Sequence, residues 1–303
     1  MQVSVIVLSW NSADYIGKCL DSLQKVSVPS GVDFRVILVD NASSDNSVKY
    51  LTKKYPQHEL LVNQSNLGYA QGNNVGIQKA LENGSDFVWI VNPDVEVHPK
   101  SLTALLAGAR NFPQGGIFGS KIYFAPGFEF HKDRYTKKDI GKVIWYAGGN
   151  MDWGNMEGHH RGVDEVDSDK YNRDLETDFV TGASMFVKSQ VYRDIGLLDS
   201  RFFLYYEEND FCQRAKAAGW KLMYIPDSIA WHANAQATGI GSGLQDYYIT
   251  RNRLFFGLRH APFYTKLLLI KQSIWLYFNG RPWQKRGVLD FYLGRLGTGS
   301  YQP

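Results

Sequence analysis

Residues 3–40 read VSVIVLSWNSADYIGKCLDSLQKVSVPSGVDFRVILVD and hold two apolar runs separated by a helical pattern. The run at 3–10 is almost continuously apolar, as expected for a parallel strand that is covered on both faces. Residues 13–25 place apolar side chains at helical spacing, and a second buried run follows at 35–40. A strand, a helix and a strand in this order predict a right-handed βαβ unit of a parallel sheet.

The same alternation of strands and helices continues through the first third of the chain. Further strands are predicted at 58–64 and 86–94, and further helices at 47–54, 75–82 and 99–109. In such sheets, ligands bind outside the carboxyl ends of the strands. The loops at these ends are therefore expected to converge on one crevice, and they span 9–12, 40–45, 66–74 and 92–96.

The pattern of alternating elements weakens in the middle of the chain. The segments 115–124 and 142–153 predict antiparallel strands joined by turns. The segment 157–173 is polar and predicts a mobile loop, in which His159 and His160 are expected to face solvent.

The composition is that of a folded chain. It has 303 residues, enough for one large or two small domains, and 44% of them are hydrophobic, which excludes a disordered protein. Cys19 and Cys212 form no CxxC motif and predict neither a disulfide framework nor a zinc site. No GxGxxG motif follows a strand and no GxxxxGK[ST] motif occurs, so a dinucleotide-binding fold and a P-loop nucleotidase are disfavoured. The first residues lack the basic region of a signal peptide, so a cytoplasmic chain is expected.

The end of the chain, residues 251–303, is basic. It contains nine of the 33 Lys and Arg residues but one of the 30 Asp and Glu residues. Its apolar stretch Lys266–Phe278 is too short to span a bilayer. Three interpretations stay open: a solvated face, a face docked on the rest of the protein, and a basic aromatic surface that meets anionic lipid or a diphosphate. A nucleic acid is not among the expected partners.

Asp40 lies at the carboxyl end of the strand at 35–40. A carboxylate there can accept hydrogen bonds from a nucleobase or from ribose hydroxyls. It can equally form an Asx-turn or cap a helix. The residue type alone does not decide between these two roles.

A second polar group is NPDVEV, residues 92–97. Side chains two residues apart on an extended chain face the same way. Asn92 and Asp94, or Asp94 and Glu96, could therefore present oxygen ligands to Mg²⁺ or Mn²⁺, which would neutralise charge on a departing diphosphate. The alternative is an ordinary turn that contains a proline.

A third group is the acidic sequence EEND, residues 207–210, directly after the apolar run FFLYY. Acids at the start of a helix are favourable with its dipole, and this alone could explain them. Carboxylates crowded at an apolar edge also have raised pKa values, which suits a general base. Spacing does not decide which acid would face a substrate.

Taken together and in order, these motifs resemble the family 2 glycosyltransferases, and most of all the rhamnosyltransferase-like branch of bacterial cell-surface polysaccharide synthesis. The segments that carry the resemblance are SVIVLSWNSADYIGKCLDSL, VILVDNASSD, NLGYAQGNN, WIVNPDVEV, DFVTGASMFV, FFLYYEENDFCQRAKAAGW, WH and YYITRNRLFF. The resemblance implies the α/β GT-A fold, with a Rossmann-like, mostly parallel nucleotide-binding sheet and a helical, basic C-terminal segment. The expected parts are a nucleotide-sugar-binding half at 1–110, an acceptor-binding half at 111–245 and the C-terminal segment at 246–303.

The resemblance also implies inverting transfer from a nucleotide sugar with Mg²⁺ or Mn²⁺. Asp94, in an NPD that stands for the family's DxD motif, would bind the metal or diphosphate together with His232. Glu208 would be the catalytic base where the family usually has Asp, with Glu207 and Asp210 as alternatives. The donor would be bound by Ser9, Asn11, Asp40, Asn66, Gly68, Asn74, Asn92, Gly182, Ala183 and Arg251.

The branch implies dTDP-L-rhamnose as the donor, with UDP-hexoses as the alternative, and a saccharide or lipid-linked saccharide as the acceptor. Residues 237–243 are expected to close over the bound donor and exclude water. Two other classes stay open. A sugar-phosphate nucleotidyltransferase would need a glycine-rich basic loop after the first strand, which SWNSADY does not provide. A non-catalytic sugar-binding scaffold would not need the acids.

Overall fold

The computed structural model describes residues 1–233 and 242–301 of the chain. Its centre is a mixed β-sheet. Along this sheet the hydrogen-bonded strands follow in the order β10 (Leu175–Glu176), β12 (Lys221–His232), β6 (Gly115–Phe124), β11 (Ser184–Lys188), β4 (Phe87–Val91), β1 (Gln2–Ser9), β2 (Asp33–Asp40) and β3 (Glu59–Val62).

The half of the sheet formed by β4, β1, β2 and β3 is parallel, as predicted. β1 and β2 pair over their whole length, from Gln2 opposite Asp33 to Ser9 opposite Asp40. Both strands are buried in their carboxyl-terminal halves. Because β1 and β2 are parallel and pair along their whole length, their carboxyl ends lie at the same edge of the sheet.

The helices α1 (Ile16–Leu23), α2 (Ser47–Lys54) and α4 (Ser101–Asn111) lie where the sequence predicts helices. By contrast, α3 (Gly68–Glu82) begins well before the predicted start at residue 75. Glycine within a helix is unfavourable in isolation, so the sequence NLGYAQGNN indicated a turn. A Cβ on Gly76 would lie 2.5 Å from Ile6 Cγ2, so this glycine allows the helix to pack closely on β1.

The second half of the sheet contains the strand predicted at 115–124, which is β6, and its antiparallel pairing is confirmed. β6 is buried along its whole length, pairs in parallel with β12 and pairs antiparallel with β11. Two short strands extend the sheet, β5 (Val95–Val97) beside β12 and β7 (Ile144–Tyr146) beside β6. The strands β8 (Gly149–Asp152) and β9 (Glu157–His160) form a separate hairpin.

The segment 157–173, predicted as a mobile loop, contains ordered structure. Its first residues form β9, and a 3₁₀ turn follows at Asp169–Tyr171. The backbone N–H of Ile144 also donates to the carbonyl oxygen of Glu165 at 2.8 Å. Of the predicted closing loop 237–243, residues 237–241 lie outside the described residues.

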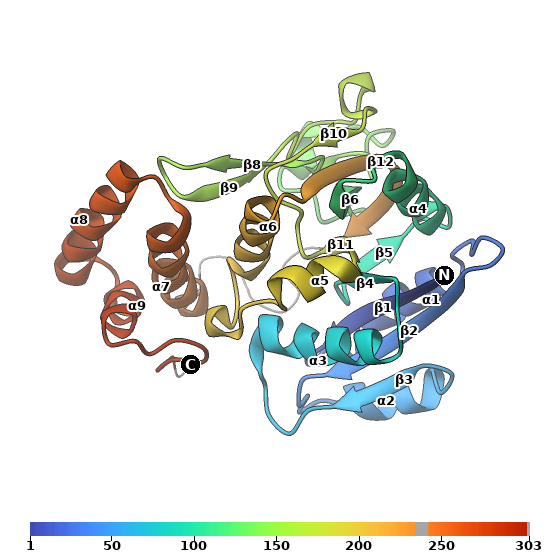
Figure 1. Cartoon of the computed structure of the whole chain (residues 1–303), viewed down its shortest axis with the longest axis horizontal. Helices are drawn as coiled ribbons and strands as arrows, with labels where there is room; N and C mark the ends of the chain where they lie inside the picture. The colour runs from blue at the N-terminus through green and yellow to red at the C-terminus, as the bar shows by residue number, and fades with distance from the viewer. Residues whose placement is uncertain (234–241, 302–303) are drawn as a thin grey trace.

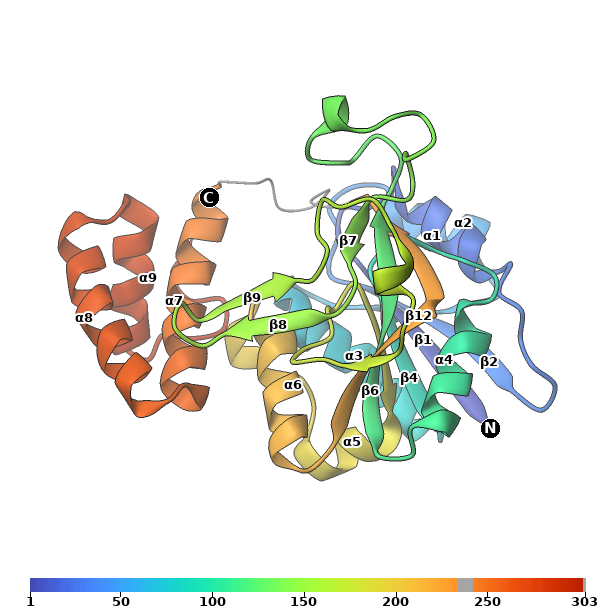
Figure 2. The ribbon, with the colours of Figure 1, turned by 90° about the horizontal axis from the view of Figure 1, so that it is seen from above.

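Two helices, α5 (Ser189–Ile195) and α6 (Glu207–Ala217), follow β11. Seen from above, α3, α5 and α6 lie on one side of the sheet, and α1 and α4 lie on the other (Figure 2). The last helices are α7 (Gly243–His260), α8 (Phe263–Asn279) and α9 (Pro282–Tyr292).

The helices α7, α8 and α9 form a group beside the sheet, with α8 farthest from it (Figures 1 and 2). The β8–β9 hairpin reaches this group. Arg253 Nε of α7 donates to the carbonyl oxygen of Asn155 at 2.8 Å, and the rings of Trp153 and Phe256 stack. Among the described residues, no helix is long and apolar enough to cross a membrane.

Candidate active site

A cavity of about 680 Å³ opens at the carboxyl ends of the parallel strands. Each of the four predicted loops contributes to its wall, for example through Trp10, Asn41, Asn66 and Asn92, so the expected convergence on one crevice is confirmed. The volume is within the ~300–1,000 Å³ typical of small-molecule sites. The predicted site residues that line the cavity are Asn66, Gly68, Asn92, Asp94, Gly182, Ala183, Glu207, Glu208 and His232.

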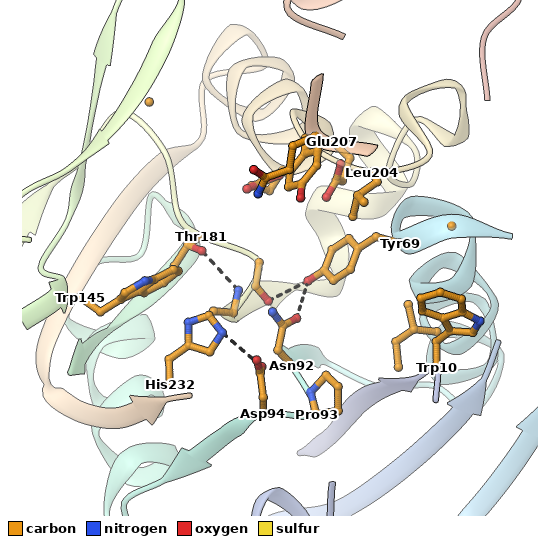
Figure 3. Close-up of a pocket in the computed structure, with 18 of the residues that line it drawn as sticks. Trp10, Tyr69, Asn92, Pro93, Asp94, Trp145, Thr181, Leu204, Glu207 and His232 are labelled. Atoms are coloured by element: carbon orange, nitrogen blue, oxygen red, sulfur yellow. Dashed lines mark hydrogen bonds and ion pairs between the residues drawn. The ribbon is translucent and has the colours of Figure 1, made fainter. Parts of the chain in front are cut away.

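One side of the cavity is formed by Asp94 and His232 (Figure 3). Asp94 lies between β4 and β5, and His232 ends β12, which pairs with β5 at this point. Asp94 Oδ1 lies 3.1 Å from His232 Nε2, and both side chains are largely buried. The indole of Trp145 packs edge-on against the His232 ring, with the ring centroids 4.4 Å apart. His232 Nδ1 is buried and has no hydrogen-bond partner in the structure.

The opposite side of the cavity is formed by the first turn of α6. Glu207 and Glu208 both line the cavity, and Glu207 is nearly buried. Burial raises the pKa of both carboxyl groups. The charge of Glu208 raises the pKa of Glu207 further. Two crowded carboxyl groups do not both ionise readily, and Glu208 is the less buried of the two, so it is the acid more open to a substrate.

Tyr69, near the start of α3, lies between these two sides (Figure 3). Its hydroxyl oxygen is 2.9 Å from Asn92 Oδ1 and 2.9 Å from the carbonyl oxygen of Gly182. Burial raises its pKa, and the charges of Glu207, Glu208 and Asp94 add to the increase, so the hydroxyl stays protonated as a donor. Carboxyl, imidazole, phenol and amide groups thus surround one cavity.

A family model described as Glycosyltransferase like family 2 matches residues 1–257. The chain belongs to this family. Among curated proteins, it is 26% identical over 244 residues to the N-acetylglucosaminyl-diphospho-decaprenol L-rhamnosyltransferase of Mycobacterium tuberculosis, which covers 78% of this chain and 77% of that protein. It is also 23% identical over 239 residues to rhamnosyltransferase WbbL of Escherichia coli, which covers 76% of this chain and 82% of that protein.

Solved structures of other glycosyltransferases have the same fold. GalNAc-T7, solved with UDP, GalNAc and Mn²⁺, matches with a TM-score of 0.68 at 16% identity; the match covers 93% of this chain and 52% of that chain, so this chain spans about half its length. Staphylococcus aureus TarS 1-349, solved with UDP-GlcNAc, matches with a TM-score of 0.57 at 15% identity over 96% of this chain and 79% of that chain. The glycosyltransferase described here therefore has the GT-A fold.

The structure places Asp210 of the glycosyltransferase away from the cavity. Its carboxylate is fully buried and is paired with Arg214, Arg259 and His260 at 2.7–2.9 Å. Its carboxylate oxygens are held by these three partners and it does not line the cavity, so Asp210 is not placed beside a substrate. The position does not fit the alternative that Asp210 is the catalytic base.

Three residues predicted to meet the nucleoside do not line the described cavity: Ser9, Asn11 and Asp40. Asp40 is buried and accepts hydrogen bonds from the backbone N–H and the hydroxyl of Ser43 at 2.9 and 2.6 Å. The hydroxyls of Ser9 and Ser12 lie 2.7 Å apart, and Asn11 Oδ1 accepts from the Ser44 N–H at 2.8 Å. The Asp40 carboxylate is thus bound locally to the residue three positions on, as in a capping interaction, in place of the Asx-turn.

Two further predicted donor contacts do not reach the cavity either. The Asn74 side chain is buried and holds the backbone of Leu198, donating to its carbonyl oxygen at 2.8 Å and accepting from its N–H at 3.1 Å. Arg251 is fully buried, and its Nη2 donates to the carbonyl oxygen of Phe202 at 3.0 Å. These side chains are occupied by backbone groups, so the expected contacts with the donor do not fit their positions.

Tyr69 and Trp145 line the cavity but were not predicted as site residues, and His160 was predicted in the wrong place. The expectation that His160 faces solvent is wrong: its Nδ1 lies 3.0 Å from the Trp145 carbonyl oxygen and its ring packs on Trp145 and Tyr146. Burial lowers the pKa of His160 to about 4, so its ring is neutral at pH 7. His159 is exposed, as expected. Trp145 could have been found from the alternation of side chains along β7. This alternation places Trp145 on the face opposite the buried side chains of Ile144 and Tyr146.

Proposed function

We propose that this glycosyltransferase transfers L-rhamnose from dTDP-L-rhamnose, with inversion, to a hydroxyl of a lipid-linked saccharide in cell-surface polysaccharide synthesis. The observation that carries the proposal is the pairing of Glu207 and Glu208 on one side of a cavity with Asp94 and His232 on the other. The choice of sugar is supported by the names of two relatives, both rhamnosyltransferases. The choice of acceptor is supported by the name of the M. tuberculosis relative, which specifies N-acetylglucosaminyl-diphospho-decaprenol.

In this proposal the acceptor hydroxyl binds beside Glu208. Glu208 takes the hydroxyl proton while the acceptor oxygen attacks the anomeric carbon from the side opposite the nucleotide. The new carbon–oxygen bond forms as the bond to the phosphate oxygen breaks, and the electron pair leaves with the nucleoside diphosphate. A single displacement of this kind inverts the anomeric centre.

The leaving diphosphate would lie on the side of Asp94 and His232. Asp94 Oδ1 and His232 Nε2, 3.1 Å apart, could hold one Mg²⁺ or Mn²⁺ together. No cluster of three or more His, Cys, Asp or Glu side chains suited to a metal occurs in 1–233 and 242–301. This is compatible with Mg²⁺, which commonly has one or two protein ligands and takes the rest from phosphates and water. When bound, such an ion stabilises the charge that develops on the departing diphosphate.

Thermal unfolding with a panel of nucleotide sugars tests the donor assignment. We expect dTDP-L-rhamnose with Mn²⁺ to raise Tm by roughly 5–10 °C at saturation, because a ligand that binds only the folded state stabilises it. Asp94→Asn should lose the Mn²⁺-dependent part of this shift. Glu96→Gln is the matched control, because Glu96 is a nearby acid that does not line the cavity, and it should keep the shift.

Each other outcome of the screen contradicts a defined part of the proposal. A larger shift with a UDP-hexose would replace the donor, and a full shift in Asp94→Asn would remove Asp94 from the metal site. Formation of a sugar nucleotide from sugar phosphate and nucleoside triphosphate would indicate a nucleotidyltransferase. Binding of no nucleotide sugar at all would favour a non-catalytic scaffold.

The same proposal includes contact of α8 with the cytoplasmic face of a membrane. α8 buries only a narrow stripe, formed by Thr265, Leu269 and Ser273. The helix contains no acid and carries Lys266 and Lys271, so its face complements anionic lipid, whereas two copies of this face would repel each other. The apolar side chains it exposes are Phe263, Tyr264, Leu267, Leu268, Ile270, Ile274, Trp275, Tyr277 and Phe278.

Co-sedimentation with lipid vesicles tests this contact. We expect the chain to bind vesicles with about 30% phosphatidylglycerol at least ~10-fold better than neutral vesicles, and high salt to weaken binding through screening. Trp275→Glu should abolish binding, whereas Val62→Glu, at an exposed valine on β3, should not. Absence of lipid binding, or a dimer that Trp275→Glu dissociates, would overturn the membrane contact.

A further inference from the structure

The loop that leads into α6 has an unusual backbone. Phe203, Tyr205 and Tyr206 have φ angles of 64°, 68° and 73°. Non-glycine residues rarely adopt positive φ, and such residues persist only where the surroundings hold them in place. Phe203, Leu204 and Tyr205 line the cavity, and Glu207 follows directly after Tyr206. The conformation of this loop therefore sets where the two acids of α6 lie.

Asn252 of α7 holds the loop from one side. Its buried Nδ2 lies 2.7 Å from the carbonyl oxygen of Phe202, 2.8 Å from that of Leu204 and 3.0 Å from that of Tyr205. The neighbouring Arg251 is also buried, and its Nη2 lies 3.0 Å from the Phe202 carbonyl oxygen. Side-chain donors from the C-terminal segment thus bind three carbonyl groups of the turn, of which that of Phe202 also accepts from the N–H of Leu204 at 2.8 Å.

The start of α3 holds the loop from the other side. The carbonyl oxygen of Phe203 accepts from the N–H groups of Tyr69 and Ala70 at 2.6 and 3.3 Å. The Phe203 ring stacks on Tyr248 of α7, with the centroids 5.0 Å apart. The loop is therefore clamped between α7 and the turn that carries Gly68 and Tyr69 into the cavity.

We propose that Asn252, assisted by Arg251, is a positioning residue for the transfer reaction. Asn252 fixes the strained loop at 203–206 and thereby aims Glu208 at the acceptor hydroxyl. This inference rests on the function proposed above. The C-terminal segment then has two proposed roles: α7 positions a loop of the active site, and α8 contacts lipid. The positioning role also accounts for Arg251, which lies in the YYITRNRLFF segment but does not reach the cavity.

The variant Asn252→Asp tests the proposal because it keeps the shape of the side chain and replaces its donor group by an acceptor. We expect kcat to fall about 30- to 100-fold while the donor Kd changes less than about threefold, since the loss affects the aim of the base and not the donor-binding groups. The acidic limb of the kcat–pH profile should move to lower pH, because a loosened loop hydrates Glu208 and lowers its pKa. Arg251→Lys should show the same split with a smaller loss, about three- to tenfold, and serves if Asn252→Asp does not fold.

Ser189→Ala is the matched control. Ser189 is also fully buried and its hydroxyl donates to the Ser85 carbonyl oxygen at 2.5 Å, but it lies on α5 and does not line the cavity. It should lower Tm without changing kcat or the pH profile. If Asn252→Asp and Arg251→Lys lose kcat, donor affinity and Tm in parallel, or keep normal kcat, the positioning role is wrong.

Hydrogen exchange separates this inference from the proposed function. Asn252→Asp should speed exchange at 202–209 in the absence of any substrate, because the loop has lost its donors. If the wild-type chain transfers no sugar, the proposed function is wrong, but hydrogen exchange still tests whether Asn252 holds the loop. If the enzyme is active and Asn252→Asp leaves exchange at 202–209 unchanged, only the role of Asn252 is wrong.

Discussion

Glu208→Gln is expected to lower kcat at least ~100-fold and to leave the donor Kd nearly unchanged. Loss of a general base commonly costs ~10²–10⁴ in rate, and glutamine keeps the size of the side chain while losing the ability to take a proton. The side of the cavity proposed to hold the donor diphosphate is formed by Asp94 and His232, which the substitution does not touch. Steady-state kinetics and calorimetry with the donor measure the two quantities separately.

Glu207→Gln is the matched control, because it is the adjacent acid of the same cavity. Glu207 is the more buried acid of the pair, so a substrate hydroxyl reaches it less readily than Glu208. We expect a loss of turnover no greater than about tenfold. A larger loss in Glu207→Gln than in Glu208→Gln would exchange the two roles.

The pH dependence of kcat tests the same assignment, that Glu208 is the base. Burial raises the pKa of Glu208, so the base becomes protonated, and turnover falls, at a pH above the ordinary glutamate range of about 4.3. Turnover should be full above this pKa and should be lost as the pH falls through it. This acidic limb should disappear from the residual activity of Glu208→Gln.

Gly68→Ala is expected to destabilise the fold by about 2–4 kcal/mol and to reduce turnover of the remaining folded enzyme at least ~10-fold. Gly68 has a φ of 78°, and a Cβ there would lie 2.5 Å from both the carbonyl oxygen and the ring of Phe203. The methyl group would push apart the start of α3 and the loop that leads to Glu207. Chemical unfolding and kcat at saturating donor measure the two effects.

Gly84→Ala isolates the backbone contribution to that effect. Gly84 has a φ of 80° but faces open space, so a methyl group on its Cα would meet no atom within 4 Å. A positive φ alone should cost about 1 kcal/mol and leave kcat unchanged. Equal losses of stability and normal turnover in both variants would contradict the close contact between Gly68 and Phe203.

Much of the fold follows from local patterns. The apolar runs at 3–10 and 35–40 predicted β1 and β2, and their parallel pairing followed from the helix between them. Polar residues after such strands predicted a cavity, and Asn66, Asn92 and Asp94 do line it. Periodic burial and strand order are properties of short segments, so they can be read without knowing the distant contacts.

Where distant contacts decide, the patterns failed. The glycines of α3 indicated a turn, because the local sequence does not show what they do in the fold. They let the helix pack closely on β1, which belongs to another part of the chain. The parallel pairing of the strand at 115–124 with β12 was not predicted, because β12 is far away in sequence. His160 was expected in solvent because its partner Trp145 belongs to a different strand.

The sequence by itself determined the family, the parallel part of the sheet and the small set of acids that are candidates for the base. Only the tertiary structure separated those acids, because Asp210 meets Arg259 and His260 of α7, whereas Glu207 and Glu208 line the cavity. Tertiary packing also buries Arg251 away from the cavity, beside the loop at 203–206. The residue type at each position can be read from the sequence. The charged and hydrogen-bonding groups that surround a side chain come from distant parts of the chain, so only the tertiary structure shows them.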